Sequence, residues 1–144
     1  MQKTTTILIA TCMGLAVVCG LQIARAQGKS TAEGVYTTAQ AMRGAAIYKE
    51  QCAACHGDDL RGNDIIPGLA GDTFAGNWQG KSVGDLFDKI SMTMPALNPG
   101  SLKPEQVAEV IANILSTSKH PAGTMDLAST LAALQQIKID PPKR

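Results

Sequence analysis

The sequence predicts a small all-α domain, because three segments carry helix signals and the stretches between them are rich in glycine, proline and aspartate. Residues 39–51 contain several alanines, the strongest helix formers. Ser82 and Asp85 have the spacing of a capping box, with apolar residues at helical spacing behind them. Residues 104–115 begin with proline and repeat apolar residues at i, i+3, i+4, i+7 and i+8. A length of 144 residues fits one domain of this kind.

The first 26 residues are predicted to be a signal peptide. Lys3 provides the positive start, residues 7–23 are largely apolar, and Ala24-Arg25-Ala26 has the small-residue pattern of a cleavage site. An uncleaved anchor helix is the alternative, although the apolar run is slightly short for a full span. Cleavage after Ala26 would leave 118 residues, exported to the periplasm and with no stable membrane span.

The remaining chain divides into a flexible arm at 27–38, which is small and polar, and one domain at 39–144. It would carry eleven basic and twelve acidic residues, a net charge of −1. Such a chain has no strong field for capturing nucleic acid or an anionic membrane. Aromatic residues make up only 3% of the sequence, which is thin for a core of this size. A large apolar cofactor would supply the missing core.

The run Cys52-Ala53-Ala54-Cys55-His56 is a C-x-x-C-H motif, the signature of covalent haem c attachment. One helical turn puts both thiols and the imidazole on the same face, so the cysteines can bond the porphyrin edge while His56 becomes the proximal iron ligand. Two alternatives remain open: a redox dithiol, and a zinc site that would need the distant His120. Loss of the leader would remove the only other cysteines, so no structural disulfide is expected.

Two residues downstream of the motif are candidates for supporting this site. Pro67 lies in the loop expected at 57–71, and its carbonyl could accept the second ring proton of His56; an ordinary turn proline is the alternative. Trp78 could donate its indole N–H to a haem propionate or could simply pack in the core.

Met94 is the candidate for the second axial ligand. The proline after it favours an extended backbone, so its thioether can project from a stiff loop. A thioether opposite histidine raises the reduction potential. Met42, Met92, Met125 and the absence of a sixth protein ligand stay open as alternatives.

Several packing features are also expected. Gly44, in the middle of 39–51, predicts the close approach of another helix, and the amphipathic helix at 104–115 is expected to cross there. His120 lies in a polar breaker and is expected at the surface. Asp126 is expected to cap a last helix.

Taken together, these residues resemble class I cytochrome c over residues 39–123. The elements that carry the resemblance are Cys52–His56, Pro67-Gly68-Leu69, Trp78, Thr93-Met94-Pro95 and a closing helix. The resemblance implies an all-α fold of three to five helices around one haem c, held covalently by Cys52 and Cys55. It further implies His56 and Met94 as iron ligands, the Pro67 carbonyl as partner of His56, and Trp78 near a propionate.

A narrower resemblance concerns the segment after Met94. Thr93-Met94-Pro95, followed by Pro99-Gly100-Ser101-Leu102 and later Pro121-Ala122-Gly123, is similar to small periplasmic cytochromes associated with quinoprotein alcohol dehydrogenases. Asn113 and His120 depart from that pattern, where an aromatic and an apolar residue are usual.

The function expected from this reading is single-electron transfer rather than enzymatic catalysis. A periplasmic dehydrogenase would be the donor, and an oxidase or another cytochrome the acceptor. The alternatives are an electron-accepting subunit of a dehydrogenase complex and, from another class, a five-coordinate haem enzyme or gas-binding protein. A haem-free dithiol oxidoreductase is the fourth reading.

Overall fold

The structure is a computed structural model that describes residues 30–142. Its elements in chain order are η1 (Thr31–Glu33), α1 (Thr38–Gln51), α2 (Ala53–His56), α3 (Gly71–Trp78), α4 (Val83–Thr93), α5 (Pro104–Thr117) and α6 (Leu131–Leu134). Over these residues the only β-pairing consists of isolated bridges, so the predicted all-α class is confirmed. Residues 30–142 form six α-helices where three to five were expected, but α2 and α6 have only four residues each.

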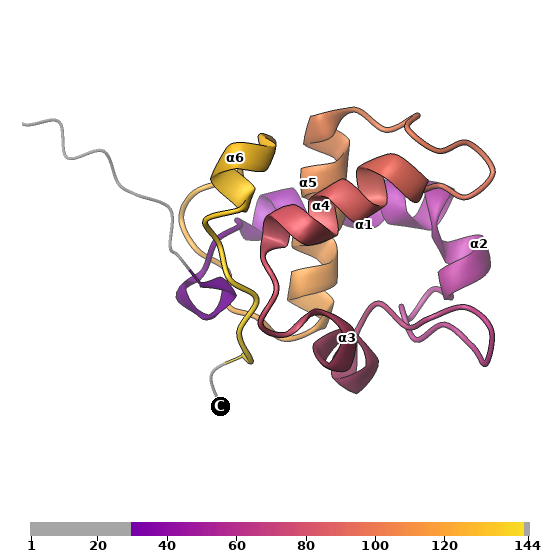
Figure 1. The fold of residues 1–144 in the computed structure, drawn as a ribbon, viewed down its shortest axis with the longest axis horizontal. Helices are drawn as coiled ribbons and strands as arrows, with labels where there is room; N and C mark the ends of the chain where they lie inside the picture. The colour runs from indigo at the N-terminus through magenta and orange to yellow at the C-terminus, as the bar shows by residue number, and fades with distance from the viewer. Residues whose placement is uncertain (1–29, 143–144) are drawn as a thin grey trace, which may run out of the picture.

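The centre of the fold is the crossing of α1 and α5, which Figure 1 shows. A Cβ atom on Gly44 would lie 1.7 Å from the backbone oxygen of Glu109, so only glycine allows the two backbones to meet there. The predicted close approach at Gly44 is therefore confirmed. α5 buries its apolar face completely beneath α1 and α4, and this face supplies much of the core: Val107, Val110, Ile111, Ile114 and Leu115.

α4 begins at the predicted capping box. The Ser82 hydroxyl accepts a hydrogen bond from the Asp85 N–H at 3.0 Å, and the Asp85 carboxylate accepts one from the Ser82 N–H at 2.9 Å. These hydrogen bonds lower the pKa of Asp85. The helix ends at Thr93, slightly beyond the expected end near Ser91, and Met94 follows in the extended conformation that its proline neighbour favours.

The described part of the expected flexible arm packs into the core instead. Thr31, Val35 and Tyr36 are buried, and the Tyr36 hydroxyl donates to the backbone oxygen of His120 at 2.7 Å. The small polar residues around Val35 and Tyr36 had predicted a flexible arm. Burying these two large apolar side chains is favourable enough to hold the segment against the core. The packed chain thus begins by Ser30 rather than at residue 39. The predicted signal peptide lies outside the described residues.

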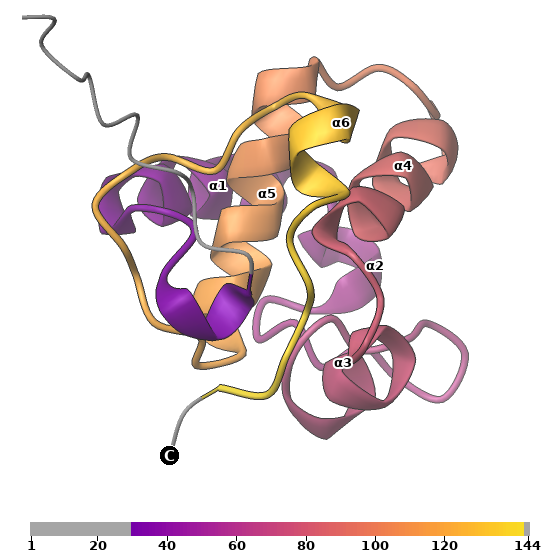
Figure 2. The ribbon, with the colours of Figure 1, turned by 60° about the vertical axis from the view of Figure 1, so that its left-hand side comes forward.

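Residues 137–140 form a C-terminal segment that runs between the N-terminal residues and the α3–α4 connection, as Figure 2 shows in yellow. The Lys138 oxygen accepts from Thr31 N–H at 2.9 Å, and the Ile139 N–H donates to Lys81 oxygen at 2.9 Å. Ile137 and Ile139 point into the core. This segment ties the two ends of the described residues to the connection between α3 and α4.

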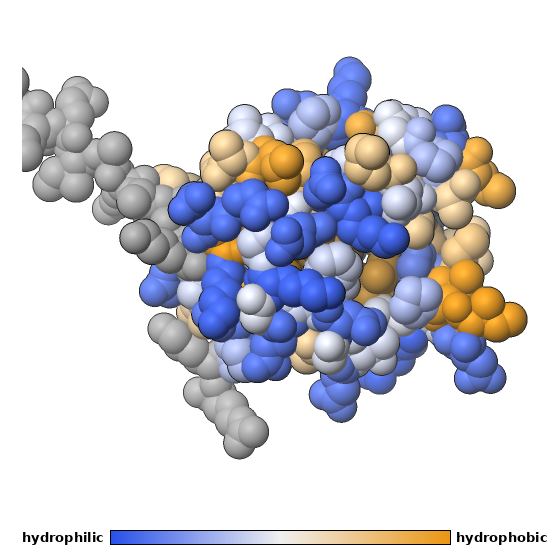
Figure 3. Space-filling view, in the orientation of Figure 1, coloured by the Kyte–Doolittle hydropathy of each residue, from blue (hydrophilic) through white to orange (hydrophobic). Residues whose placement is uncertain are grey.

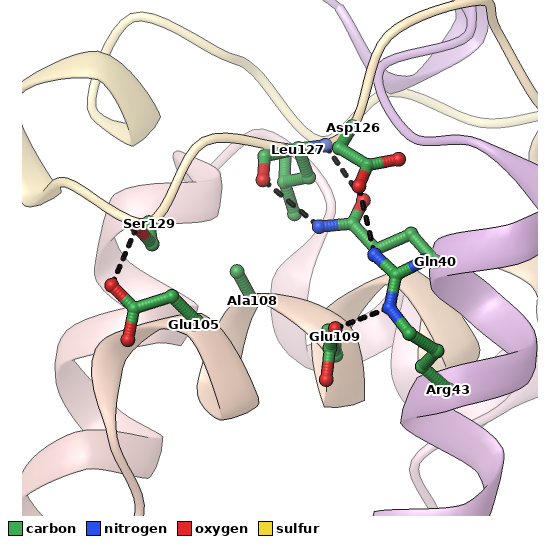
Figure 4. Close-up of a pocket in the computed structure, with 8 residues that line it drawn as sticks. All are labelled: Gln40, Arg43, Glu105, Ala108, Glu109, Asp126, Leu127 and Ser129. Atoms are coloured by element: carbon green, nitrogen blue, oxygen red, sulfur yellow. Dashed lines mark hydrogen bonds and ion pairs between the residues drawn. The ribbon is translucent and has the colours of Figure 1, made fainter.

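Asp126 does not cap a helix, which corrects the expectation. Its carboxylate accepts hydrogen bonds from the Thr37 hydroxyl and, at 2.8 Å, from Arg43, which also pairs with Glu109 at 2.5 Å. α6 starts only at Leu131. Figure 4 shows Arg43, Glu109 and Asp126 at the edge of a pocket, whose volume is about 180 Å³. Asp126 therefore anchors the loop after α5 onto α1 rather than starting a helix.

Candidate functional site

The C-x-x-C-H motif lies on a single tight turn. Cys52 ends α1, and its backbone oxygen accepts from the N–H groups of Cys55 at 3.1 Å and His56 at 3.0 Å. Cys52 is half-buried, Cys55 is exposed, and no disulfide joins them. His56 is buried. The local backbone therefore presents two thiols and one imidazole from the same turn.

Tyr48 supports this turn, a role that the sequence did not reveal. Its hydroxyl donates to the Gly57 oxygen at 2.7 Å, and its backbone oxygen accepts from the Cys52 N–H at 2.9 Å. Burial raises the pKa of Tyr48, so the phenol stays a neutral donor. One residue of α1 thus holds the backbone on both sides of the motif. Helical spacing could have found it, since Tyr48 lies four residues before Cys52.

The imidazole of His56 is held by the Pro67 backbone oxygen, which lies 2.9 Å from Nδ1. A carbonyl can only accept, so Nδ1 must carry a proton, and in the neutral ring Nε2 then keeps the free lone pair. This is the tautomer that a metal-bound histidine adopts when its other nitrogen is oriented by a carbonyl. The contact assigns Nε2 as the nitrogen available to a ligand.

The loop between α2 and α3 is closed tightly enough to fix the Pro67 oxygen. Gly62 N–H donates to His56 oxygen at 2.8 Å, and the Asn63 side chain accepts from the Ile65 and Ile66 N–H groups, both at 2.9 Å. Gly62 has a φ of 67°, and a Cβ there would lie 2.2 Å from the Ile66 oxygen. This turn therefore needs glycine, and it returns the chain to the imidazole.

Met94 differs from the other three candidate methionines in its exposure. It is half-buried, whereas Met42 is 70% exposed, Met92 69% and Met125 37%. The loop after Met94 is turned by hydrogen bonds from Asn98 N–H to Pro95 oxygen at 2.9 Å and from Ser101 N–H to Asn98 oxygen at 3.3 Å. Figure 1 places the end of α4, this loop and α2 at the same end of the molecule. Met94 is thus the best placed of the four.

Trp78 ends α3 and is half-buried against the core. The Lys81 ammonium lies 4.9 Å from the centre of its ring, a cation–π geometry that fixes the outer face of the indole. The structure thus brings Trp78 to a lysine, and a role at a propionate remains a prediction.

His120 is buried rather than exposed, which corrects the expectation for this residue. Its ring meets Phe74 edge to face at 6.4 Å, and its Nδ1 is buried without a hydrogen-bond partner. Burial lowers the pKa of His120. Among residues 30–142 no cluster of three or more histidine, cysteine or acidic side chains could hold a metal ion, so the zinc reading lacks its ligands there.

The thiol chemistry of the motif does not favour a redox dithiol. Burial and the neighbouring Cys55 raise the pKa of Cys52 to about 11. Catalytic C-x-x-C thiols instead have a lowered pKa, because the thiolate is the nucleophile. Unpaired thiols beside a histidine with a free Nε2 fit a covalently attached haem.

An all-α fold with a C-x-x-C-H turn whose histidine is oriented by a backbone carbonyl defines the class I c-type cytochromes. The comparison with known families agrees: the model described as cytochrome C oxidase, cbb3-type, subunit III matches residues 39–114, more than half of the chain. The chain belongs to this family and is a haem-binding electron-transfer cytochrome. No curated protein and no solved structure matches it. None of the described helices is long and apolar enough to cross a membrane.

Proposed function

We propose that this chain is a periplasmic monohaem cytochrome that passes single electrons between protein partners and is not itself an enzyme. One haem c would be attached through Cys52 and Cys55, with His56 and Met94 as the axial iron ligands. The observation that carries the ligation is the 2.9 Å contact between His56 Nδ1 and the Pro67 oxygen, which keeps Nε2 free for iron. Export rests on the predicted leader alone.

The bound haem would supply an iron that alternates between the ferrous and ferric states. The chain's own residues then do three things. The Pro67 carbonyl orients His56 and strengthens it as a ligand, and Tyr48 holds the turn that carries both thiols. Met94 would add a neutral, soft donor that favours the ferrous state. With both axial positions filled by protein, no substrate site at the iron is needed.

Two kinds of partner follow from this proposal. The matched family's description names an oxidase subunit, which supports an oxidase, or a cytochrome serving one, as the acceptor. The resemblance to cytochromes associated with quinoprotein alcohol dehydrogenases supports a periplasmic dehydrogenase as the donor. A permanent subunit of such a complex is the second candidate, and co-purification of the exported protein with a larger subunit would favour it.

The ligation is tested by spectra of the protein made in a haem-attaching host. We expect a haem that denaturation does not extract and a reduced form that does not bind carbon monoxide. A colourless protein would overturn the proposal, and rapid carbon monoxide binding by the native protein would favour a five-coordinate haem protein.

Met94→Ala should open the sixth position and give a reduced protein that binds carbon monoxide, because the thioether would no longer occupy it. Met92→Ala is the matched control, since Met92 is 69% exposed two residues away. Carbon monoxide binding by the control alone would exclude Met94 as the ligand.

A further inference from the structure

We propose that the C-terminal segment, residues 137–140, is an acid-sensitive closure: when His120 takes up a proton, the segment detaches while the crossing of α1 and α5 stays intact. His120 follows the end of α5 and lines a pocket of about 250 Å³ together with Ile139 and Asp140 of the segment. The segment lies across the molecule from α2, as Figure 1 shows. The proposed device is therefore separate from the C-x-x-C-H turn.

Two polar groups of this pocket are buried without a partner. Ser118 is 8% exposed and His120 is 6% exposed, and neither the Ser118 hydroxyl nor Nδ1 of His120 has a hydrogen-bond partner among the described residues. A buried polar group without a partner destabilises the arrangement that buries it, and a charged imidazole with two N–H donors destabilises it more. A motion that brings water to the ring is therefore favoured by acid.

The backbone of His120 is held on both sides, so the ring cannot reach water by a shift of its own chain. The His120 N–H donates to the Leu115 oxygen at 3.0 Å in the turn that ends α5, and the His120 oxygen accepts from the Tyr36 hydroxyl at 2.7 Å. Phe74, which meets the ring edge to face, is 1% exposed. These contacts belong to the core, which leaves the C-terminal segment as the side of the pocket that can move.

The C-terminal segment is attached by few contacts. Its two large apolar side chains, Ile137 and Ile139, are buried. Figure 3 shows mainly hydrophilic surface where Figure 1 places the segment. Backbone hydrogen bonds of 2.8–2.9 Å join it to its neighbours: Gly80 N–H to Ile139 oxygen, Ile139 N–H to Lys81 oxygen, Val83 N–H to Ile137 oxygen and Thr31 N–H to Lys138 oxygen. Such an edge can open without unfolding the helices, and opening would free the connection between α3 and α4.

The charged and titratable groups around the imidazole come from every element at the pocket: Asp72 of α3, Lys119 beside His120, Asp140 of the segment and Tyr36 of the N-terminal residues. Asp140 attracts a proton to His120, but burial outweighs this attraction and lowers the pKa of His120. The Asp140 carboxylate also lies 3.5 Å from the Lys138 ammonium. The pKa of Tyr36 is raised, so the phenol stays neutral. An opened, hydrated His120 would regain an ordinary pKa of about 6.5, so acid below this pH favours the open form.

Native-state hydrogen exchange of the haem-loaded protein tests the proposal, because it follows single amides. The reporters are the amides of Thr31, Gly80 and Ile139, which donate across the edges of the segment. The reference is the amide of Ile111, in the buried face of α5. Exchange rates at pH 7 and pH 5, corrected for the intrinsic rates, give the opening equilibrium. Low concentrations of denaturant distinguish local opening from global unfolding.

At pH 5 the three reporters should exchange at least about tenfold faster than Ile111 after correction, with almost no dependence on denaturant. Between pH 7 and pH 5 their opening equilibrium should rise at least about threefold, and the ceiling set by an ordinary pKa of about 6.5 is about 25-fold. His120→Leu should abolish this rise. Lys119→Gln, at the exposed neighbouring position, is the matched control and should keep it.

Reporters that exchange at the corrected rate of Ile111, with the same denaturant dependence, would overturn the proposal, since the segment would then open only in global unfolding. The absence of a rise in the wild type would overturn it without any variant. A rise that persists in His120→Leu would assign the opening to another group. His120→Gln, which cannot titrate either, gives the same test if the leucine variant does not fold. Covalent haem, followed by absorption on the same samples, reports separately on the proposed function.

Discussion

At the scale of single residues, His120 shows most clearly how the folded chain changes the properties of a side chain, because burial lowers its pKa. Its ring lies against Phe74, its Nδ1 has no partner, and its own backbone oxygen accepts from the Tyr36 hydroxyl. The polar residues around it, between Ser116 and Gly123, had predicted a surface loop. Its neighbours in the fold, Phe74 against the ring and Tyr36 at the backbone oxygen, lie far from it in the sequence and meet it only in the folded chain.

His120 should make the folded protein sensitive to acid. Burial lowers its pKa in the folded state, and the Asp140 carboxylate offsets this only in part. The folded state then resists a proton that the unfolded chain takes up near pH 6.5. Above the pKa that His120 has in the unfolded chain, the histidine is neutral in both states and the folded protein keeps its full stability. As the pH falls below that pKa, the free energy of unfolding decreases. Denaturant unfolding of the haem-loaded protein at pH 7 and pH 5 should show this loss.

His120→Leu should have a smaller loss of stability between pH 7 and pH 5 than the wild type. Lys119→Gln, at the exposed neighbouring position, should keep the wild-type loss. An unchanged pH dependence in His120→Leu would mean that other groups govern the acid response.

At the scale of elements, the helix positions follow from local signals. The capping box at Ser82 starts α4, proline starts α5, and alanine-rich α1 leads directly into the motif. The boundaries shifted by only a residue or two from those expected. α3 and the late start of α6 were not predicted, because short helices contain too few residues to show a period.

Gly44 should be intolerant of any side chain. Gly44→Ala would press a Cβ against the backbone of Glu109, which cannot move without shifting α5. We expect a loss of at least about 1–3 kcal/mol in the free energy of unfolding. Denaturant unfolding of the haem-loaded protein measures it.

Gly76→Ala provides the control for that substitution. Gly76 lies in α3, where an added Cβ would meet nothing within 4 Å, so alanine should leave stability unchanged or raise it by up to about 1 kcal/mol. Equal losses at the two positions would contradict the role assigned to the crossing.

At the scale of the whole molecule, the family match ends at residue 114, and the described flanks on both sides of it pack together. The Ser30 hydroxyl donates to the Asp140 carboxylate at 2.9 Å across 110 positions of the sequence. The same C-terminal segment pairs with residues 80–83, where α3 leads into α4. The flanks thus pack against each other and against the connection between α3 and α4.

Ile139→Ala should therefore weaken the entire fold, by about 2–5 kcal/mol for a fully buried isoleucine. Lys138→Ala, the exposed neighbour that points the other way, should cost little. Thermal unfolding of both haem-loaded variants checks this. A wild-type melting temperature for Ile139→Ala would show that the segment is only loosely attached.

The sequence by itself determined the class of this protein. The C-x-x-C-H turn, the helical segments and the need for glycine at position 44 are local patterns, and local patterns can be read along the chain. It also pointed to the Pro67 carbonyl, whose oxygen lies 2.9 Å from His56 Nδ1. Only the tertiary structure decided that Tyr36 and Ile139 belong to the core and that His120 is buried. The physical reason is that these residues lie outside segments whose apolar residues recur at helical spacing, so no local pattern marks them as buried. Their partners, as far apart in the sequence as Ser30 and Asp140, meet only when the whole chain has folded.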